Sequence, residues 1–177
     1  MESEDGIFYE AYKWITPIMI RGGKAEDEAF ASARLACDHS ARAITALRSE
    51  LTDVEQVIYY CEYFSVQCNM TGLIHFFECG ISFFYYEVIA ALGVIGAEEM
   101  IEDLTRCKQA IFGDEEVPVH DGMLMEDFTY SDDPAREEEM KIIDEISSCE
   151  RLGAFHKQLE NYVLSCAEKG LLKKPIG

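Results

Sequence analysis

The residues that decide the fold are 81–113, which read ISFFYYEVIAALGVIGAEEMIEDLTRCKQAIFG. Residues 82–95 are apolar almost all round, which predicts a helix at the centre of a core. Gly96 can adopt the left-handed conformation that ends such a helix. Residues 98–112 carry acids early and basic residues late, as the helix dipole favours, and Gly113 follows them. The stretch therefore predicts two successive helices, the first buried and the second amphipathic.

Helical patterns continue toward the N-terminus. Residues 9–19 predict a first helix that is broken near Pro17, and residues 26–47 place apolar side chains at helical spacing. Thr52 and Glu55 have the spacing of a capping box, in which each side chain accepts a hydrogen bond from the backbone amide of the other residue. A third helix is therefore expected to begin directly after Thr52.

The C-terminal part repeats these signals. A short segment is expected at residues 71–78, an acidic helix from residue 135 to about 149 and a last helix from about 153 to 169. No convincing alternating strand and no hairpin dipeptide between apolar runs is present. The sequence therefore predicts an all-α fold, a single compact multi-helix domain of about six to eight helices.

One domain also fits the length and composition. The chain has 177 residues, of which 49% are hydrophobic, enough to bury a substantial core. We expect a single domain over 1–177 with four segments. These are the N-terminal helices (1–50), a central unit (51–113), an acidic loop with its helix (114–150), and a C-terminal helix with its tail (151–177).

Acidic residues dominate the charge. Lys and Arg number 15 against 34 Asp and Glu, which gives a formal net charge of -19. Residues 114–150 concentrate this charge and mix apolar residues with the acids, which predicts an ordered loop followed by an acidic helix rather than a disordered tail. A surface of this sign repels phosphates, so the sequence disfavours both direct binding of nucleic acid and binding to anionic membranes.

The N-terminus and the cysteines indicate the compartment. The first residues, MESEDGIFYE, are acidic where a signal peptide is basic and then apolar, and no apolar run approaches a membrane span of about 18 residues. Seven cysteines are present, and an odd number in a chain of this length does not indicate a disulfide framework. We expect reduced, partly buried thiols and a cytoplasmic protein.

Signatures of catalysis and metal binding are weak. There is no phosphate-binding loop, dinucleotide fingerprint or nucleophile elbow. Cys61 and Cys68 could share a helix face, but a structural zinc site needs four ligands. His75 and Cys79 could form a nucleophilic pair, although no third residue orients them, and His120-Asp121 lacks the ordered oxygen spacing of a calcium loop. The sequence predicts no metal, no cofactor and no enzymatic activity.

A resemblance enters with the central unit. The residues that carry it are Leu51, Glu55, Tyr60, Glu62, Gln67-x-Asn69-x-x-Gly72, His75-Phe76-Phe77, Ala91-Leu92-x-x-Ile95-Gly96-Ala97 and Phe112. This pattern resembles the bacterial acidic DNA-mimic protein family of the DMP nineteen type, and the last helix, with Phe155 and Tyr162, is also similar. The resemblance covers about residues 50–165.

The resemblance implies an all-α, homodimeric acidic protein. Its carboxylates would stand in for DNA phosphates on the surface of a DNA-binding protein, such as a helix-turn-helix regulator. From the distribution of acids we take as candidate partner-binding residues Asp114, Glu115, Glu116, Asp121, Glu126, Asp127, Asp132, Asp133, Glu137, Glu138, Asp144 and Glu145, with a second row at Glu98, Glu99, Glu102 and Asp103.

Two alternatives stay open. An immunity or antitoxin-like inhibitor would present acids to the basic surface of a toxin or enzyme, with exposed aromatic residues such as Phe128 and Tyr130 as hot spots. An acidic surface can also serve only to keep a protein soluble. Salt dependence and competition by DNA separate the mimic from the inhibitor.

Overall fold

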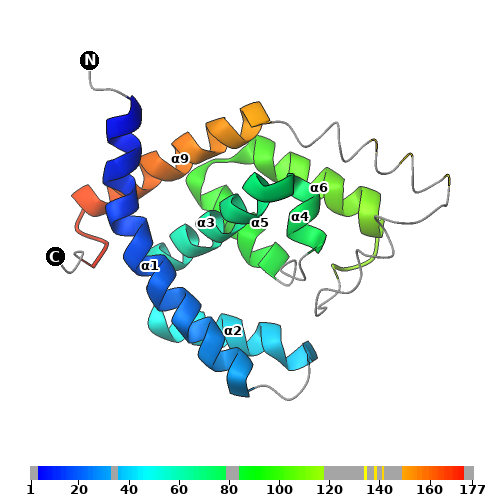
Figure 1. Ribbon diagram of the computed structural model, residues 1–177, viewed down its shortest axis with the longest axis horizontal. Helices are drawn as coiled ribbons and strands as arrows, with labels where there is room; N and C mark the ends of the chain where they lie inside the picture. Colours follow the sequence, from blue (N-terminus) through cyan, green and yellow to red (C-terminus); the bar gives the residue numbers. More distant parts are fainter. Residues whose placement is uncertain are drawn as a thin grey trace.

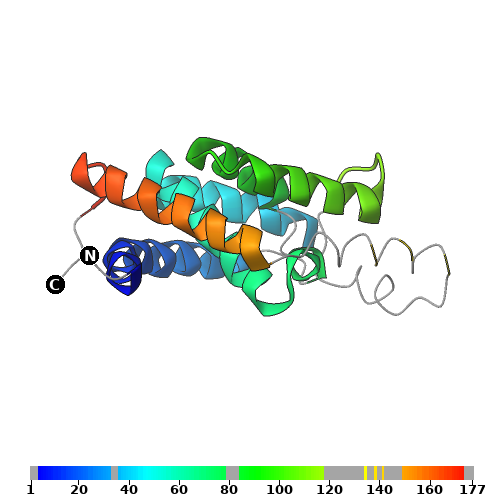
Figure 2. The same ribbon diagram turned by 90° about the horizontal axis from the view of Figure 1, so that it is seen from above.

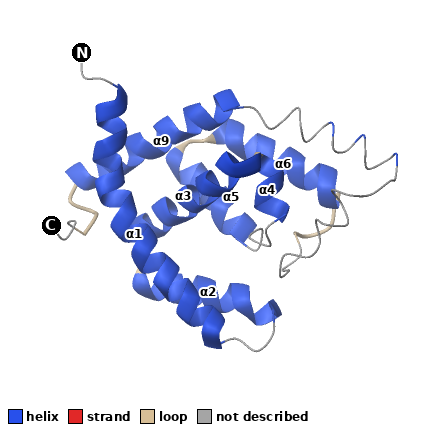
Figure 3. Ribbon diagram, viewed as in Figure 1, coloured by secondary structure: helices blue, strands red, loops and turns tan. Residues whose placement is uncertain are grey.

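The computed structural model describes residues 4–32, 36–78, 84–117 and 149–173, with single positions at 134, 138 and 141. Within these ranges all regular structure is helical and no strand occurs, which confirms the predicted all-α fold (Figure 3). The helices are α1 (Glu4–Ser32), α2 (Ala36–Glu50), α3 (Asp53–Thr71), α4 (Leu73–Glu78), α5 (Tyr85–Ile95), α6 (Glu98–Phe112) and α9 (Cys149–Glu168).

Helix α3 lies in the middle of the molecule, and α9 packs beside it along the upper side of the view in Figure 1. Helix α1 packs on both of them from one side; from the other, α5 contacts both and α6 contacts α9. Turning the view by 90° places α1 along one edge and the green helices α5 and α6 along the opposite edge (Figure 2). The remaining N-terminal helix, α2, lies mainly against α1. The residues that decide the fold therefore form the side of the molecule that faces away from α1.

The N-terminus of α3 has the predicted capping box. The Thr52 hydroxyl accepts the backbone N–H of Glu55, and the Glu55 carboxylate accepts the backbone N–H of Thr52 at 3.0 Å. Arg21 of α1 adds two hydrogen bonds to the same carboxylate, at 2.6 and 3.4 Å. One carboxylate thus starts the central helix and also binds the first helix to it.

Several predicted helix boundaries are wrong. The last helix, α9, begins at Cys149 rather than at about residue 153. Helix α1 continues through Pro17, and the single helix expected over residues 26–47 belongs to two helices, α1 and α2. Proline disrupts a helix by removing one amide and crowding the preceding turn. Here the neighbouring Ile15 and Ile18 are buried in the core, and this packing outweighs the local cost.

The predicted bounds of α6 and the predicted end of α5 are confirmed, but α5 begins at Tyr85 rather than at residue 82 and is not buried on all sides, because Tyr86 and Val94 are exposed. Helix α6 has the bounds that were expected, and Gly96 ends α5 in the left-handed conformation, with φ 76° and ψ 32°. Of the described helices, none combines the length and the apolar character that crossing a membrane requires.

Aromatic rings from several helices build the core between α3, α4 and α9. Phe64 of α3 makes edge-to-face contacts with Phe76 of α4 and with Phe155 of α9, at centroid distances of 5.3 and 5.7 Å. Phe76 also contacts Phe77, which meets Phe112 of α6. Edge-to-face pairs of this kind add stability beyond the area that they bury. The His75-Phe76-Phe77 motif thus includes two rings that anchor the fold.

Helix α1 approaches α3 most closely at a glycine. A Cβ atom added at Gly22 would lie 2.2 Å from Cε2 of Tyr59, far inside van der Waals contact. The Tyr59 ring cannot easily move, because it is buried and its hydroxyl donates a 2.6 Å hydrogen bond to Glu26. Gly23, the next residue, has open space at its Cβ position. The absence of a side chain at position 22 therefore sets the distance between the two helices.

Phenol and carboxyl groups form further links between α1 and α3. Glu26 of α1 accepts hydrogen bonds from Tyr59 and Tyr63, and Glu62 of α3 accepts one from Tyr12 at 2.9 Å. Burial raises the pKa of both carboxyl groups above the ordinary value, and the phenol hydrogen bonds only partly offset this effect. The pKa of Glu160 on α9 is also raised by burial.

The close approach at Gly22 predicts opposite effects of two neighbouring substitutions. Gly22→Ala forces a methyl group into the Tyr59 ring, and overpacking of this kind costs about 1–3 kcal/mol. Gly23→Ala gains helix propensity without a clash and should stabilise by up to about 1 kcal/mol. Urea unfolding measures both changes. Equal stabilisation by the two substitutions would contradict the packing described for Tyr59.

The buried carboxyl groups predict a falling stability as pH rises. Because the folded pKa of Glu26, Glu62 and Glu160 exceeds 4.5, each group binds its proton more tightly in the folded state. The resulting stabilisation is complete below the ordinary pKa and is lost as pH rises through the folded pKa. These three groups should therefore contribute less to the free energy of unfolding, measured in urea, at about pH 8 than at about pH 5, while His156, whose pKa burial lowers, contributes in the opposite direction.

A matched pair of variants isolates this effect from general repulsion among acids. Glu62→Gln keeps an acceptor for Tyr12 but does not titrate, so it should flatten the pH dependence. Glu168→Gln removes an exposed acid and should leave the slope nearly unchanged. If both variants give the slope of the unmodified protein, the titration of Glu62 is not its source.

Candidate functional site: the outer face of α6

The outer face of α6 carries the acids predicted for its first turns. Met100, Leu104 and Cys107 are buried and fix which side of the helix faces the core. Glu98, Glu99 and Glu102 then lie on the opposite side and are exposed. Glu98 and Glu102 are one turn apart, a rise of about 6 Å along the helix axis. This face holds three carboxylates close together in solvent.

Asp103, predicted as the fourth member of that row, is not exposed. Its position lies one turn from both Met100 and Cys107, so its side chain turns inward and is only 2% exposed. Oδ1 accepts a 2.5 Å hydrogen bond from Arg151 of α9, and Oδ2 has no hydrogen-bond partner. A buried carboxylate needs such an ion pair. Asp103 therefore attaches α6 to α9, and the exposed row consists of three acids.

Arg151 places positive charge beside this row. Its pKa is raised by the hydrogen bond and charge of Asp103, with further contributions from Glu99 and Glu102. Arg106, one turn beyond Glu102 on α6, is also exposed. The acidic field is therefore strongest at the N-terminal end of α6, around Glu98, and is weakened toward α9.

A second group of acids follows the end of α6. The helix stops at Gly113, whose φ is 59°, and the Lys108 ammonium group donates a 2.7 Å hydrogen bond to the Gly113 carbonyl oxygen. Three exposed acids come directly after this cap: Asp114, Glu115 and Glu116. The two acidic groups thus lie at opposite ends of a helix of 15 residues, about 22 Å in length.

Most of the other predicted site residues lie outside the described residues. Glu138 is described: it is exposed and lies 3.6 Å from the ammonium group of Lys141. The candidates that fall on undescribed positions are Asp121, Glu126, Asp127, Asp132, Asp133, Glu137, Asp144 and Glu145. Phe128 and Tyr130 lie there as well. The structure brings together the acids of α6, and the grouping expected along residues 114–150 stays a prediction beyond residue 117.

An apolar stripe on α5 was missed by the sequence reasoning. Tyr86 and Val94 are 55% and 57% exposed, and between them Ala90 and Gly93 are exposed too. These positions follow one face of the helix at spacings of three and four residues. Because α5 is apolar almost all round, with Glu87 as its one charged residue, periodicity alone cannot separate its outer face from its buried one. Only the packing of the other helices identifies the exposed side.

One pair of side chains on α3 and α9 resembles a catalytic arrangement. Ser65 Oγ lies 2.6 Å from Nε2 of His156, and Asn69 donates to Ser65 Oγ at 3.4 Å. The Ser65 side chain is buried, however, and burial also lowers the pKa of His156. A nucleophile has to reach its substrate. The pair is better explained as a polar link that satisfies two groups between packed helices.

Four of the cysteines are shown to be core residues. Cys61, Cys68, Cys107 and Cys166 are buried and carry free thiols, in agreement with the prediction of reduced, partly buried thiols. Burial, followed by the charge of Asp103, raises the pKa of Cys107 to about 12, so its thiol stays protonated. In the part of the chain that the structure describes, no three His, Cys, Asp or Glu side chains are grouped to hold a metal ion. Cys79, His120 and Asp121 fall outside that part.

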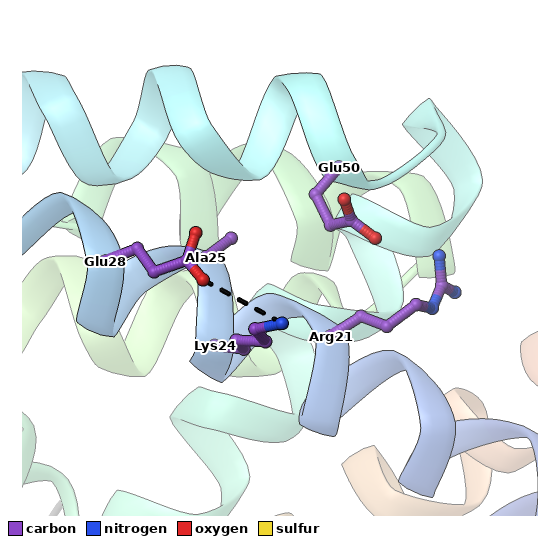
Figure 4. Close-up of a pocket in the computed structure, with 5 residues that line it drawn as sticks. All are labelled: Arg21, Lys24, Ala25, Glu28 and Glu50. Carbon is purple, nitrogen blue, oxygen red and sulfur yellow. Dashed lines mark ion pairs between the residues drawn. The ribbon is translucent and has the colours of Figure 1, made fainter.

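A shallow cavity of about 210 Å³ lies between α1 and the end of α2, lined by Arg21, Lys24, Ala25, Glu28 and Glu50 (Figure 4). Its two basic side chains already have partners: Arg21 binds Glu55, and Lys24 lies 3.9 Å from Glu28. Figure 4 shows the Arg21 side chain extending away from Lys24. The cavity therefore does not direct both cations toward one ligand.

Comparison with known proteins gives one match. The sequence model of the family described as DMP19-like protein matches residues 49–172, which include α3 to α6 and α9 but almost none of α1 and α2. No curated protein and no solved structure matches the chain. The matched residues are more than half of the chain, and they agree with the resemblance seen in the Asn-Gly turn, the paired Phe residues and the Ile-Gly-Ala helix end. The chain therefore belongs to the DMP19-like family.

Proposed function

We propose that this protein is an acidic DNA mimic, which binds the DNA-binding surface of a protein partner and competes with DNA for it. The observation that carries the proposal is the exposed carboxylate group Glu98, Glu99 and Glu102 on the outer face of α6. It is supported by the net charge of -19 and by membership of the DMP19-like family. The proposal requires no catalytic step and no cofactor.

The physics of DNA binding explains why such a face could compete. Proteins that bind duplex DNA neutralise its phosphates with Lys and Arg, and much of their affinity comes from released counterions. Carboxylates on a rigid helix offer the same basic surface a set of fixed negative charges without base edges. Long-range attraction between the two surfaces raises the rate of association and makes it sensitive to salt.

The proposal predicts a salt-sensitive complex that DNA displaces. Cytoplasmic proteins captured on the immobilised chain should include a DNA-binding protein that elutes with a salt gradient or with its own duplex DNA. The affinity of the purified complex should fall at least about tenfold between about 50 and 200 mM salt. A captured protein that stays bound in excess duplex DNA would count against mimicry.

Charge-matched variants locate the binding face. The triple variant Glu98→Gln, Glu99→Gln, Glu102→Gln should weaken the complex and reduce its salt dependence, because it removes the exposed acids of α6. The control Asp27→Asn, Glu28→Gln, Glu168→Gln removes three exposed acids from other helices and should bind nearly as well. Equal losses in the two variants would indicate attraction to the net charge alone.

A second candidate function is an immunity or antitoxin-like inhibitor of a basic toxin or enzyme. The exposed Tyr86 on α5 favours it, because an aromatic hot spot beside acids is typical of such inhibitors. DNA would not displace that partner unless the partner itself binds DNA. The homodimer implied by the family resemblance stays a prediction, which sedimentation of the purified chain can test.

A further inference from the structure

The exposed stripe on α5 has the dimensions of a helix-binding surface. Tyr86 and Val94 are eight residues apart, about 12 Å along the axis, and both are more than half exposed. Between them Ala90 and Gly93 present little or no side chain, which allows another backbone to come close. The stripe therefore offers two large apolar contacts with a shallow space between them.

This apolar stripe lies next to the acidic row of α6. A Cβ atom at Gly93 would lie 3.9 Å from Cδ1 of Ile101, so the outer side of α5 meets α6 at this point. Ile101 is half-buried, and Glu98 and Glu102 lie on the exposed face beside it. Only Gly96 and Ala97 separate the end of α5 from Glu98. Apolar contacts and negative charge thus share one side of the molecule.

We infer that this composite face, formed by Tyr86, Ala90, Gly93 and Val94 with Glu98 and Glu102, binds a basic amphipathic helix of the partner protein. The negative charges of Glu98 and Glu102 favour a basic helix over a neutral or acidic one. The apolar side of such a helix covers the α5 stripe, while its Lys and Arg side chains reach the α6 carboxylates. A partner surface that has only basic, phosphate-binding residues and no apolar ones would leave the α5 stripe exposed to water.

The same charges disfavour a second copy of this chain. Placing two α5 stripes face to face would bring the carboxylates beside them toward each other, in a chain whose net charge is already -19. Like charges placed opposite each other across an interface cost several kcal/mol. A cationic helix turns the same acids into attractive contacts.

The inference rests on the proposed function and specifies the element that the partner contributes. It adds an apolar contact that DNA cannot provide. Part of the binding should therefore persist at salt concentrations that screen the carboxylates, since screening weakens charge pairs and not apolar burial.

The test uses two synthetic peptides with the intact protein. One places Leu on one face of a helix and Lys on the other over about 18 residues, and the second has the same composition in scrambled order. Fluorescence anisotropy at about 150 mM salt should show at least tenfold tighter binding of the patterned peptide. Equal affinity of the two peptides would overturn the inference, since charge alone would then account for binding.

Variants of the protein identify the face. Tyr86→Ser with Val94→Ser should weaken binding of the patterned peptide about tenfold or more and leave the scrambled peptide unaffected. Ile20→Ser removes an apolar side chain that is even more exposed but lies on α1, and it should change the binding of neither peptide. Ala90→Gln blocks the close approach without removing an apolar anchor and should also weaken binding, with folding checked by circular dichroism.

The outcomes separate this inference from the proposed function. If Glu98→Gln with Glu102→Gln weakens binding of the captured DNA-binding protein but the α5 variants do not, the mimic stands and the helix-binding inference fails. If the α5 variants convert a dimer to a monomer in sedimentation, a second copy occupies the stripe and the inference is overturned. If the α6 variants and the α5 variants both weaken binding of the captured protein, and the oligomeric state does not change, the helix-binding inference is supported.

Discussion

The ion pair between Arg21 and Glu55 is the interaction on which the arrangement of the helices depends. Glu55 is only 1% exposed, and its carboxylate accepts two hydrogen bonds from the guanidinium group and one from the Thr52 backbone. These bonds hold the pKa of Glu55 below its ordinary value, although burial acts in the opposite direction. Breaking a buried pair by removing one partner costs about 3–5 kcal/mol. The pair therefore fixes where α3 begins and where α1 crosses it.

This contact also joins the family unit to the helices outside it. The DMP19-like match covers residues 49–172, and α1 lies wholly before it. Even so, α1 packs against α3 and α9 through buried side chains and through phenol, carboxyl and guanidinium groups. The N-terminal helices therefore cover one side of α3 and α9. The opposite side, where α5 and α6 lie, is the one on which we propose that a partner binds.

The position of each acidic residue decides whether it links helices inside the protein or adds negative charge to the surface. Inside the protein, Glu26, Glu55, Glu62 and Asp103 each accept a hydrogen bond from a Tyr or Arg side chain, as burial requires. On the surface of α6 the acids face water. The high net charge is thus divided between a few acids that hold helices together and a larger number available to attract a basic partner.

Local signals predicted much of this fold, and tertiary packing decided the rest. The Thr52 capping box, the Gly96 cap and the bounds of α6 depend on residues close in sequence, so they could be predicted. The passage of α1 through Pro17 depends on contacts with helices far along the chain. The inward position of Asp103 could have been predicted from its spacing to Met100 and Cys107, but its ion pair with Arg151, 48 residues away, could not.

The outer side of α5 could not be predicted either, because a helix that is apolar almost all round gives little periodic signal. It was found from the exposure of Tyr86 and Val94 once the neighbouring helices were in place. The acids beyond residue 117 had the strongest compositional signal, and their role stays a prediction.

The central claim is that the face formed by α5 and α6 binds the partner. Hydrogen–deuterium exchange of the complex with a captured DNA-binding protein, compared with the chain alone, tests this claim most directly. The account predicts slower exchange across residues 86–109, with little change in α1 and α2. Slower exchange confined to α1 and α2, with residues 86–109 unchanged, would contradict it.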